Sequence, residues 1–133
     1  MSNLSGWKLA DVSGEAMREW CELLRDDNAI HLDPQAAAAL GFGPRTVNPG
    51  PANLGYILNF LAASLPNDSP QSLDARFMGN VLAGDTVEVD GVMNGNQVSA
   101  RLTVKNDAGE HMPVVEAQIT LVSGDSDAAH RDV

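Results

Sequence analysis

The sequence has few of the residues that form cross-links, metal centres or basic surfaces. Cys21 is the only cysteine among 133 residues, which excludes an internal disulfide and a multi-cysteine metal site, and we expect a core thiol there. Only 8 lysines and arginines stand against 18 acidic residues, and they are scattered from Lys8 to Arg131. Because nucleic-acid binding needs a concentrated basic face, the composition argues against a nucleic-acid partner.

Long apolar runs are also missing. No stretch approaches the roughly 18 apolar residues of a membrane-spanning helix, and residues 1–5 lack the basic and apolar regions of a signal peptide. We therefore expect a cytoplasmic protein with no membrane partner. The length fits one domain, which we assign to residues 1–122. Residues 123–133 are polar, acidic and aperiodic, and we predict a frayed tail there.

The first half of the chain carries three helix signals. Ser13 precedes a predicted helix whose apolar face consists of Met17, Trp20, Cys21 and Leu24. Asp33 and Pro34 are typical of the start of a second helix, which ends at Gly41. A third helix, mostly buried, is predicted at residues 51–65 from the apolar stripe Leu54, Ile57, Leu58, Leu61 and Leu65.

From Leu73 onward apolar and polar residues alternate, which is typical of half-buried antiparallel strands. The alternation is clearest at residues 86–90, 98–105 and 115–121. We predict turns at 91–97 and 106–109, and a loop at 67–70. The apolar face of this sheet needs a cover, and the helix at 51–65 is the one predicted element long and apolar enough to provide it. The sequence therefore predicts an α+β fold in which an antiparallel sheet wraps around a central helix.

A short segment after the first predicted helix contains Asp26, Asn28 and His31. A turn can aim this carboxylate, amide and imidazole at one point, where they would hold and deprotonate a water molecule. Without further context, the segment alone favours a structural interpretation, in which Asp26 and Asn28 cap or close a loop and His31 is a half-buried side chain satisfied by hydrogen bonds. Since His, Cys and acidic residues do not cluster at ligand spacing, we expect no metal site.

The segment Asp26-Asp27-Asn28-Ala29-Ile30-His31-Leu32-Asp33, with the alanine-rich stretch and Gly41-Phe42 after it, closely resembles the Asp-x-Asn-Pro-x-His-x-Asp motif of MaoC-like (R)-specific enoyl-CoA hydratases. Arg76-Phe77 and Gly84-Asp85-Thr86 resemble that family's elements at the start of later strands. The resemblance extends over roughly residues 7–122. It implies the hot-dog fold, with a five-stranded antiparallel sheet wrapped around a long central helix.

The resemblance also implies an activity. Members are lyases that add water reversibly to a trans-2-enoyl thioester and give an (R)-3-hydroxyacyl thioester. Asp26 and His31 match the catalytic pair, and Asn28 matches the amide that orders the site. Gly50 matches the glycine at the start of the central helix, whose N–H would polarise the thioester carbonyl.

The chain departs from the family pattern on both sides of this site. Leu24-Arg25 replaces the usual Ser/Thr-Gly, and Ala29 replaces the motif proline. The usual Ala-His-Gly-Met at the helix start is Asn48-Pro49-Gly50-Pro51, and because proline lacks an N–H, Gly50 and Ala52 remain as local donors. We therefore expect retained core chemistry and altered substrate specificity.

Other residues of the central helix are candidates for substrate binding. Asn53 and Tyr56 would line the pocket, although Tyr56 is equally expected as a core aromatic. No redox cofactor or metal is implied, because the thioester carbonyl itself is the electron sink. Coenzyme A or acyl carrier protein would enter as part of the substrate. Arg25, Arg45 and Arg101 are candidates for contact with coenzyme A phosphates, although a solvated surface role is expected for any one of them.

We expect a homodimer, because one such sheet leaves an exposed edge strand and a single hot dog offers half of the family's thioester tunnel. Two alternatives remain open. A hot-dog acyl-CoA thioesterase is disfavoured by the absence of Asp and Glu from residues 51–66. A non-catalytic acyl-binding subunit of a heteromeric hydratase is favoured by the altered helix start and disfavoured by the intact Asp26, Asn28 and His31.

Overall fold

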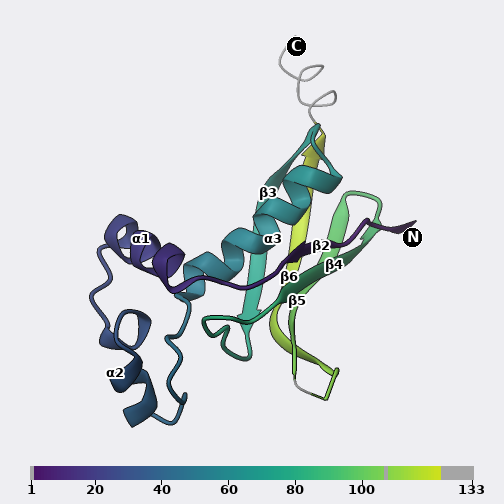
Figure 1. The fold of residues 1–133 in the computed structure, drawn as a ribbon. Coiled ribbons are helices and arrows are strands. Elements are labelled where there is room, and N and C mark those ends of the chain that lie inside the picture. The colour runs from purple at the N-terminus through teal and green to yellow at the C-terminus, as the bar shows by residue number, and fades with distance from the viewer. Residues whose placement is uncertain (1, 107, 124–133) are drawn as a thin grey trace.

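The computed structural model describes residues 2–106 and 108–123 (Figure 1). Short strands β1 and β2 come first, a helical region follows, and the second half is a sheet. The elements in order are β1 (Ser2–Asn3), β2 (Trp7–Leu9), α1 (Gly14–Leu24), the 3₁₀ helix η1 (Ala29–His31), α2 (Pro34–Ala39), α3 (Gly50–Ser64), β3 (Asp68–Phe77), β4 (Val87–Asn94), β5 (Gln97–Lys105) and β6 (His111–Ser123).

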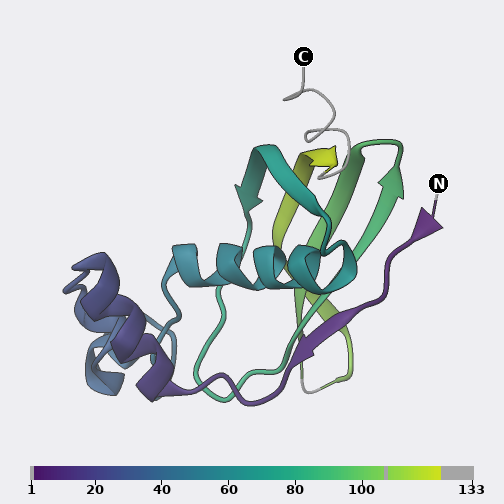
Figure 2. The same cartoon turned by 90° about the horizontal axis from the view of Figure 1, so that it is seen from above.

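The sheet is antiparallel and has the order β1-β4-β5-β6-β3, with β2 also paired to β4. Helix α3 lies across one face of the sheet, which curves around it (Figures 1 and 2). The expected α+β hot-dog arrangement is therefore confirmed. The sheet has six strands rather than five: four come from the second half of the chain, and the N-terminal segment adds β1 and β2, which both pair with β4. Segments of two and three residues carry no detectable alternation, so their pairing was not predicted.

The core lies between α3 and the sheet. Ile57 and Phe60 are fully buried and belong to one cluster with Val87, Leu102 and Ile119. The buried face differs from the predicted stripe, because Phe60 lies inside while Leu58 is 40% exposed. Gly91 explains the difference: a Cβ there would lie 3.0 Å from the Phe60 ring, so only glycine leaves room for it. Burial of each large apolar side chain contributes about 2 kcal/mol.

Two predicted connections are longer than the observed ones. The loop expected at residues 67–70 is the start of β3, which pairs with β6 from Asp68 and has a register shift beside Pro70. Because β3 is an edge strand, it tolerates Pro70 and exposes both of its faces. The start of β3 therefore shows no alternation of apolar and polar residues, and its proline suggested a loop. The turn expected at 91–97 is confined to Gly95 and Asn96, because β4 runs to Asn94 and β5 begins at Gln97.

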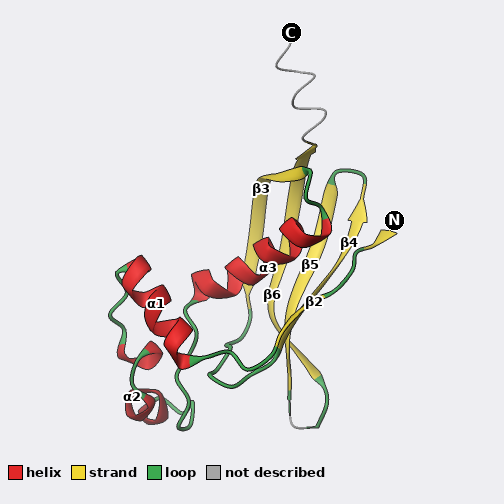
Figure 3. Cartoon of the chain, turned by 45° about the horizontal axis from the view of Figure 1, so that its top comes forward, coloured by secondary structure: helices red, strands yellow, loops and turns green. Residues whose placement is uncertain are grey.

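The helical region extends beyond one end of the sheet. Helices α1 and α2 lie beside the N-terminal end of α3 (Figure 3). Helix α1 contacts α3 where Trp20 lies against Gly55, at which a Cβ would be 3.4 Å from the indole ring. Both predicted caps are confirmed: Ser13 Oγ accepts from the N–H of Ala16, and Asp33 Oδ1 accepts from that of Gln35.

The predicted tail is only partly covered. Ser123 is the last residue of β6, and the rest of residues 123–133 lies outside the described residues. Within the described residues, none of the helices has the length and apolarity to span a bilayer.

Candidate active site

Asp26 is aimed by the end of α1. Arg25 adopts the left-handed conformation, with φ 53° and ψ 40°, and its N–H donates to the carbonyls of Cys21 and Glu22. The N–H of Asp26 then donates to the carbonyl of Cys21 at 2.9 Å. This is the Schellman pattern of helix termination, which turns the chain sharply after the last helical residue. These backbone hydrogen bonds therefore fix the position of Asp26 just beyond the end of α1.

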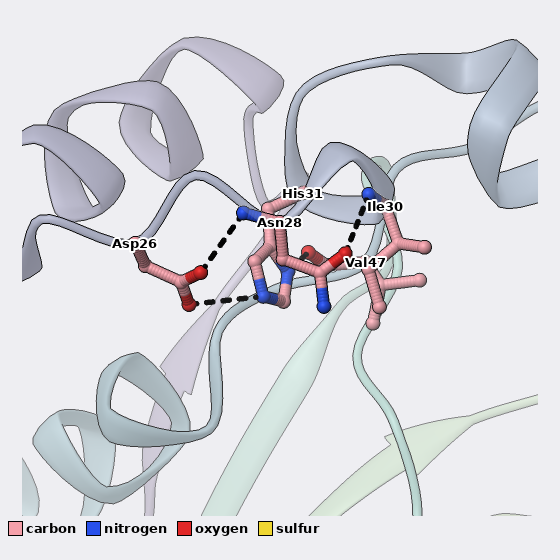
Figure 4. Close-up of polar contacts among 5 residues, drawn as sticks. All are labelled: Asp26, Asn28, Ile30, His31 and Val47. Carbon is pink, nitrogen blue, oxygen red and sulfur yellow. Dashed lines mark hydrogen bonds and ion pairs between the residues drawn. The ribbon is translucent and has the colours of Figure 1, made fainter.

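Short-range hydrogen bonds order the segment between Asp26 and His31 (Figure 4). Asp26 Oδ1 accepts from the N–H of Asn28 at 3.0 Å, and Asn28 Oδ1 accepts from the N–H of Ile30 at 3.3 Å. Asn28 is thus the N-cap of η1, and its carbonyl accepts from the N–H of His31 at 3.1 Å. The motif's amide orders the segment through its oxygen, while the carboxylate and imidazole face each other.

The imidazole of His31 is held from both sides. Its Nδ1 lies 2.6 Å from the carbonyl oxygen of Val47, and its Nε2 lies 3.2 Å from Asp26 Oδ2. Because a carbonyl only accepts hydrogen bonds, Nδ1 must carry the proton. The other ring nitrogen, Nε2, then faces the carboxylate of Asp26. The contact places a carboxylate and an imidazole within reach of each other, as general acid and base chemistry requires.

The pair has one buried and one open end. The side chain of His31 is 10% exposed and that of Asp26 is 35% exposed. Asp26 lines a pocket of about 350 Å³ together with Cys21 and Arg25, and His31 lines a second pocket of similar volume with Arg45. Burial raises the pKa of the Cys21 thiol, and the charge of Asp26 raises it further. This cysteine is therefore a neutral thiol near pH 7 rather than a nucleophile.

At the start of α3, one backbone N–H group donates to no backbone carbonyl among the described residues. Pro49 occupies the N-cap without a side-chain hydrogen bond, and its carbonyl accepts from the N–H groups of Ala52 at 3.0 Å and Asn53 at 3.3 Å. Ala52 is thus already engaged, and Pro51 has no N–H. The N–H of Gly50 donates to no backbone carbonyl within the part of the chain that the structure describes. Of the two expected donors, Gly50 is the one left free for a ligand.

Asn53 and Tyr56 belong to a buried cluster with Asn48. The Nδ2 of Asn48 lies 2.7 Å from Asn53 Oδ1 and 3.1 Å from Tyr56 Oη. Tyr56 also stacks on Trp7, with ring centroids 5.6 Å apart. Burial raises the pKa of Tyr56, and the hydrogen bond from Asn48 opposes that rise. The structure joins these two predicted residues to each other through Asn48, and neither contacts the side chain of Asp26 or His31 by a hydrogen bond within the described residues.

The three candidate arginines lie in different places. Arg25 lines the pocket at Asp26. Arg45 is 2.7 Å from Asp85, and Arg101 on β5 is 2.8 Å from Glu116 on β6. Sequence reasoning missed Val47, which acts through a backbone carbonyl and carries no side-chain signal. It also missed the role of Asn48, whose partners only the fold brings together.

Comparisons with known proteins identify a family and two relatives. The model of the MaoC like domain matches residues 11–115. A UPF0336 protein of Streptomyces avermitilis is 32% identical over 131 residues, covering 85% of this chain and 84% of that protein. The peroxisomal multifunctional enzyme type 2 of Drosophila melanogaster is 30% identical over 82 residues, which are 59% of this chain but 14% of the enzyme.

A solved structure gives the same answer for the fold. The R-hydratase PhaJ1 of Pseudomonas aeruginosa superposes with a TM-score of 0.71 at 20% sequence identity, covering 92% of this chain and 82% of the hydratase. At this level of identity the likeness concerns the fold alone. The family model, by contrast, spans the helical region, α3 and most of the sheet. The chain therefore belongs to the MaoC-like domain family.

Proposed function

We propose that this protein is a hydro-lyase that adds water reversibly to a trans-2-enoyl thioester, giving an (R)-3-hydroxyacyl thioester. The observation that carries the proposal is the contact between Asp26 and His31, in which the ring orientation is fixed by Val47. Membership of the MaoC-like family supports the reaction class. The (R) configuration rests on the likeness to R-hydratases.

A closed proton cycle follows from this geometry. The Asp26 carboxylate takes a proton from water as the water oxygen bonds to the β-carbon of the substrate. The protonated Nε2 of His31 gives its proton to the α-carbon. The proton held by Asp26 then passes to His31 across their 3.2 Å contact, which restores both groups. Because the two groups are neighbours, the hydroxyl group and the α-proton are both added to the same face of the double bond.

The N–H of Gly50 would stabilise the negative charge that develops on the thioester oxygen during this addition. It belongs to the first residue of α3, where the positive end of the helix dipole lies. Val47, which anchors His31, is separated from Gly50 by only two residues in the chain. A donor and an acid–base pair held by the same short segment match the requirements of a reaction that passes through an enolate.

The active form in this proposal is a homodimer. Strand β3 lies at the end of the sheet, and its outer edge is unpaired within the described residues. Phe77 at its end is 53% exposed and Met78 is 37% exposed. Two copies joined through β3 would pair these backbone groups and cover the apolar side chains. Light scattering at micromolar concentration tests this, and a monomer would contradict it.

A turnover assay tests the activity. The purified chain is mixed with trans-2-enoyl-CoA substrates of several lengths, and the loss of the conjugated enoyl-thioester absorbance is followed. We expect hydration without release of free coenzyme A. Release of free thiol would indicate the thioesterase alternative. Acyl-CoA binding without turnover would favour the non-catalytic subunit of a heteromer.

A further inference from the structure

Residues 47–50 connect the imidazole of His31 to the helix start. The carbonyl of Val47 accepts from His31 Nδ1 at 2.6 Å, and its N–H donates to the carbonyl of Ile30 at 2.9 Å. The N–H of Asn48 donates to the carbonyl of Val81 at 2.7 Å. This short stretch is therefore fixed to η1 on one side and to the segment before β4 on the other.

The start of α3 lacks the usual means of fixing its geometry. Pro49 at the N-cap has no side chain that can accept a hydrogen bond, and the structure has no side-chain cap at this end. Pro51 contributes no donor. Something else must hold the first turn, because a misplacement of about 1 Å in a catalytic donor is enough to cost on the order of 10²-fold in rate.

Asn48 takes the place of the missing cap. Its side chain is almost fully buried and spans from the extended segment to the first two turns of the helix. One hydrogen of Nδ2 is donated to Asn53 Oδ1 and the other to Tyr56 Oη, so both donors of the amide are used. Tyr56 is in turn held by its stacking on Trp7 of β2. Asn48 and Tyr56 together therefore connect the helix start to β2 in the N-terminal part of the sheet.

We propose that Asn48 is the positioning residue of the site, which fixes the N–H of Gly50 relative to the Asp26–His31 pair by clamping Asn53 and Tyr56. This role rests on the proposed hydratase function. The clamp lies where the chain departs from its family's Ala-His-Gly-Met pattern. In this role Asn53 and Tyr56 are the anchors of Asn48 on the helix, and Gly50 is the residue that meets the substrate.

The first arm of the test measures kinetics with trans-2-enoyl-CoA. Because the clamp orients a donor used in the transition state, Asn48→Ala should lower kcat by about 10- to 100-fold and change KM by less than about threefold. Tyr56→Phe keeps the ring on Trp7 and removes one acceptor, so it should give a smaller loss of kcat. Asn67→Ala, at an exposed asparagine just after α3, is the matched control and should behave as the wild type.

The second arm needs no activity. Tyr56 is the only tyrosine of the chain, so the rise of tyrosinate absorbance at alkaline pH reports on it alone. Asn48→Ala removes the hydrogen bond that opposes the effect of burial, so the pKa of Tyr56 should rise above the wild-type value. Tyr56→Phe should abolish the transition, and Asn67→Ala should leave it in place. Circular dichroism across the titration establishes that each variant remains folded.

The outcomes separate this role from the function on which it rests. An inactive wild type would overturn the hydratase function and the positioning role with it. An active wild type with unchanged kcat in folded Asn48→Ala would overturn the positioning role alone. An unchanged or lowered pKa of Tyr56 in that variant would overturn the clamp, because Asn48 would then not be donating to the hydroxyl.

Discussion

Within the described part of the chain, two histidine–carboxylate pairs have nearly equal lengths. His31 Nε2 lies 3.2 Å from Asp26, and His111 Nδ1 lies 3.3 Å from Glu88. Their surroundings differ. The side chain of His31 is 10% exposed, whereas that of His111 is 46% exposed. Distance alone therefore does not distinguish a candidate catalytic pair from a surface contact.

The second ring nitrogen makes the difference clearer. Val47 fixes the proton on Nδ1 of His31, so Nε2 is committed to Asp26. In the other pair the same Nδ1 of His111 faces both Glu88 and Thr103 Oγ1, and Glu88 also lies 3.9 Å from Lys8. An anchored Nδ1 and a single partner give the His31 ring one defined orientation toward Asp26. A shared and solvated contact does not.

The largest effect should come from the pair formed by Asp26 and His31. Asp26→Asn keeps the size of the side chain and removes its basicity, and His31→Ala removes the imidazole. Each should lower turnover per folded molecule by at least about 10²-fold, because each group carries one proton transfer in the proposed mechanism. The measurement is the rate of enoyl-CoA hydration, normalised to folded protein by circular dichroism.

The double variant sharpens this expectation. If both groups act on one water, the combined loss should be far smaller than the product of the two single losses. Under a purely structural role, the variants would lose about 1 kcal/mol of stability while turnover stayed near normal. Near-normal rates in Asp26→Asn would mean that the Asp26–His31 pair is no more catalytic than the exposed Glu88–His111 pair.

The next effect concerns Gly50, which has no counterpart near His111. A Cβ at Gly50 would meet only the ring of Phe77, at 3.8 Å, and its φ lies outside the left-handed region. Alanine can therefore adopt this backbone conformation without strain. Gly50→Ala should keep its free energy of unfolding within about 1 kcal/mol of wild type. Turnover should still fall by about 10-fold, because the methyl group crowds the N–H that the thioester oxygen approaches.

Thermal unfolding and kcat measured on the same preparations test this separation. Gly91→Ala is the opposite control, since a Cβ there would lie 3.0 Å from Phe60 and 3.1 Å from the carbonyl of Ser99. That variant should lose about 1 to 3 kcal/mol of stability through overpacking. Full activity in Gly50→Ala would mean that the oxyanion donor lies elsewhere.

The sequence predicted the local parts of this site and missed the non-local ones. Asp26, Asn28 and His31 lie within six consecutive residues, so the turn and the cap that join them follow from local chemistry. The carbonyl of Val47 lies sixteen residues beyond His31 in the chain, and a backbone group leaves no mark in the sequence. The pairing of β1 and β2 with β4 was missed for the same reason, because it depends on the fold.

Departures from a family pattern proved informative in one further place. The family's glycine before the catalytic acid is Arg25 here, and Arg25 adopts the left-handed conformation that glycine favours. The backbone requirement is thus retained although the residue is not. The sequence showed the departure, but only the dihedral angle shows that the chain accepts strain in order to aim Asp26.

Relief of that strain is the third prediction. Arg25→Gly should raise the free energy of unfolding by about 0.5 to 1 kcal/mol, because the strain removed exceeds the added entropy of the unfolded chain. Urea unfolding measures it. Arg18→Gly, inside α1, should lose about 1 kcal/mol instead. Destabilisation in Arg25→Gly would mean that its side chain contributes more than its backbone costs.

The smallest effect should come from the exposed pair. His111→Ala removes contacts to Glu88 and Thr103 that are partly solvated, and Glu88 keeps Lys8 as a neighbour. The loss should stay below about 1 kcal/mol, as is usual for exposed ion pairs. Turnover should match the wild type, because His111 begins β6 on the sheet, whereas Asp26 and His31 lie in the helical region at the start of α3. A His111→Ala variant that remains folded and loses at least about 10-fold in hydration rate would show that burial and a fixed tautomer do not separate the two pairs.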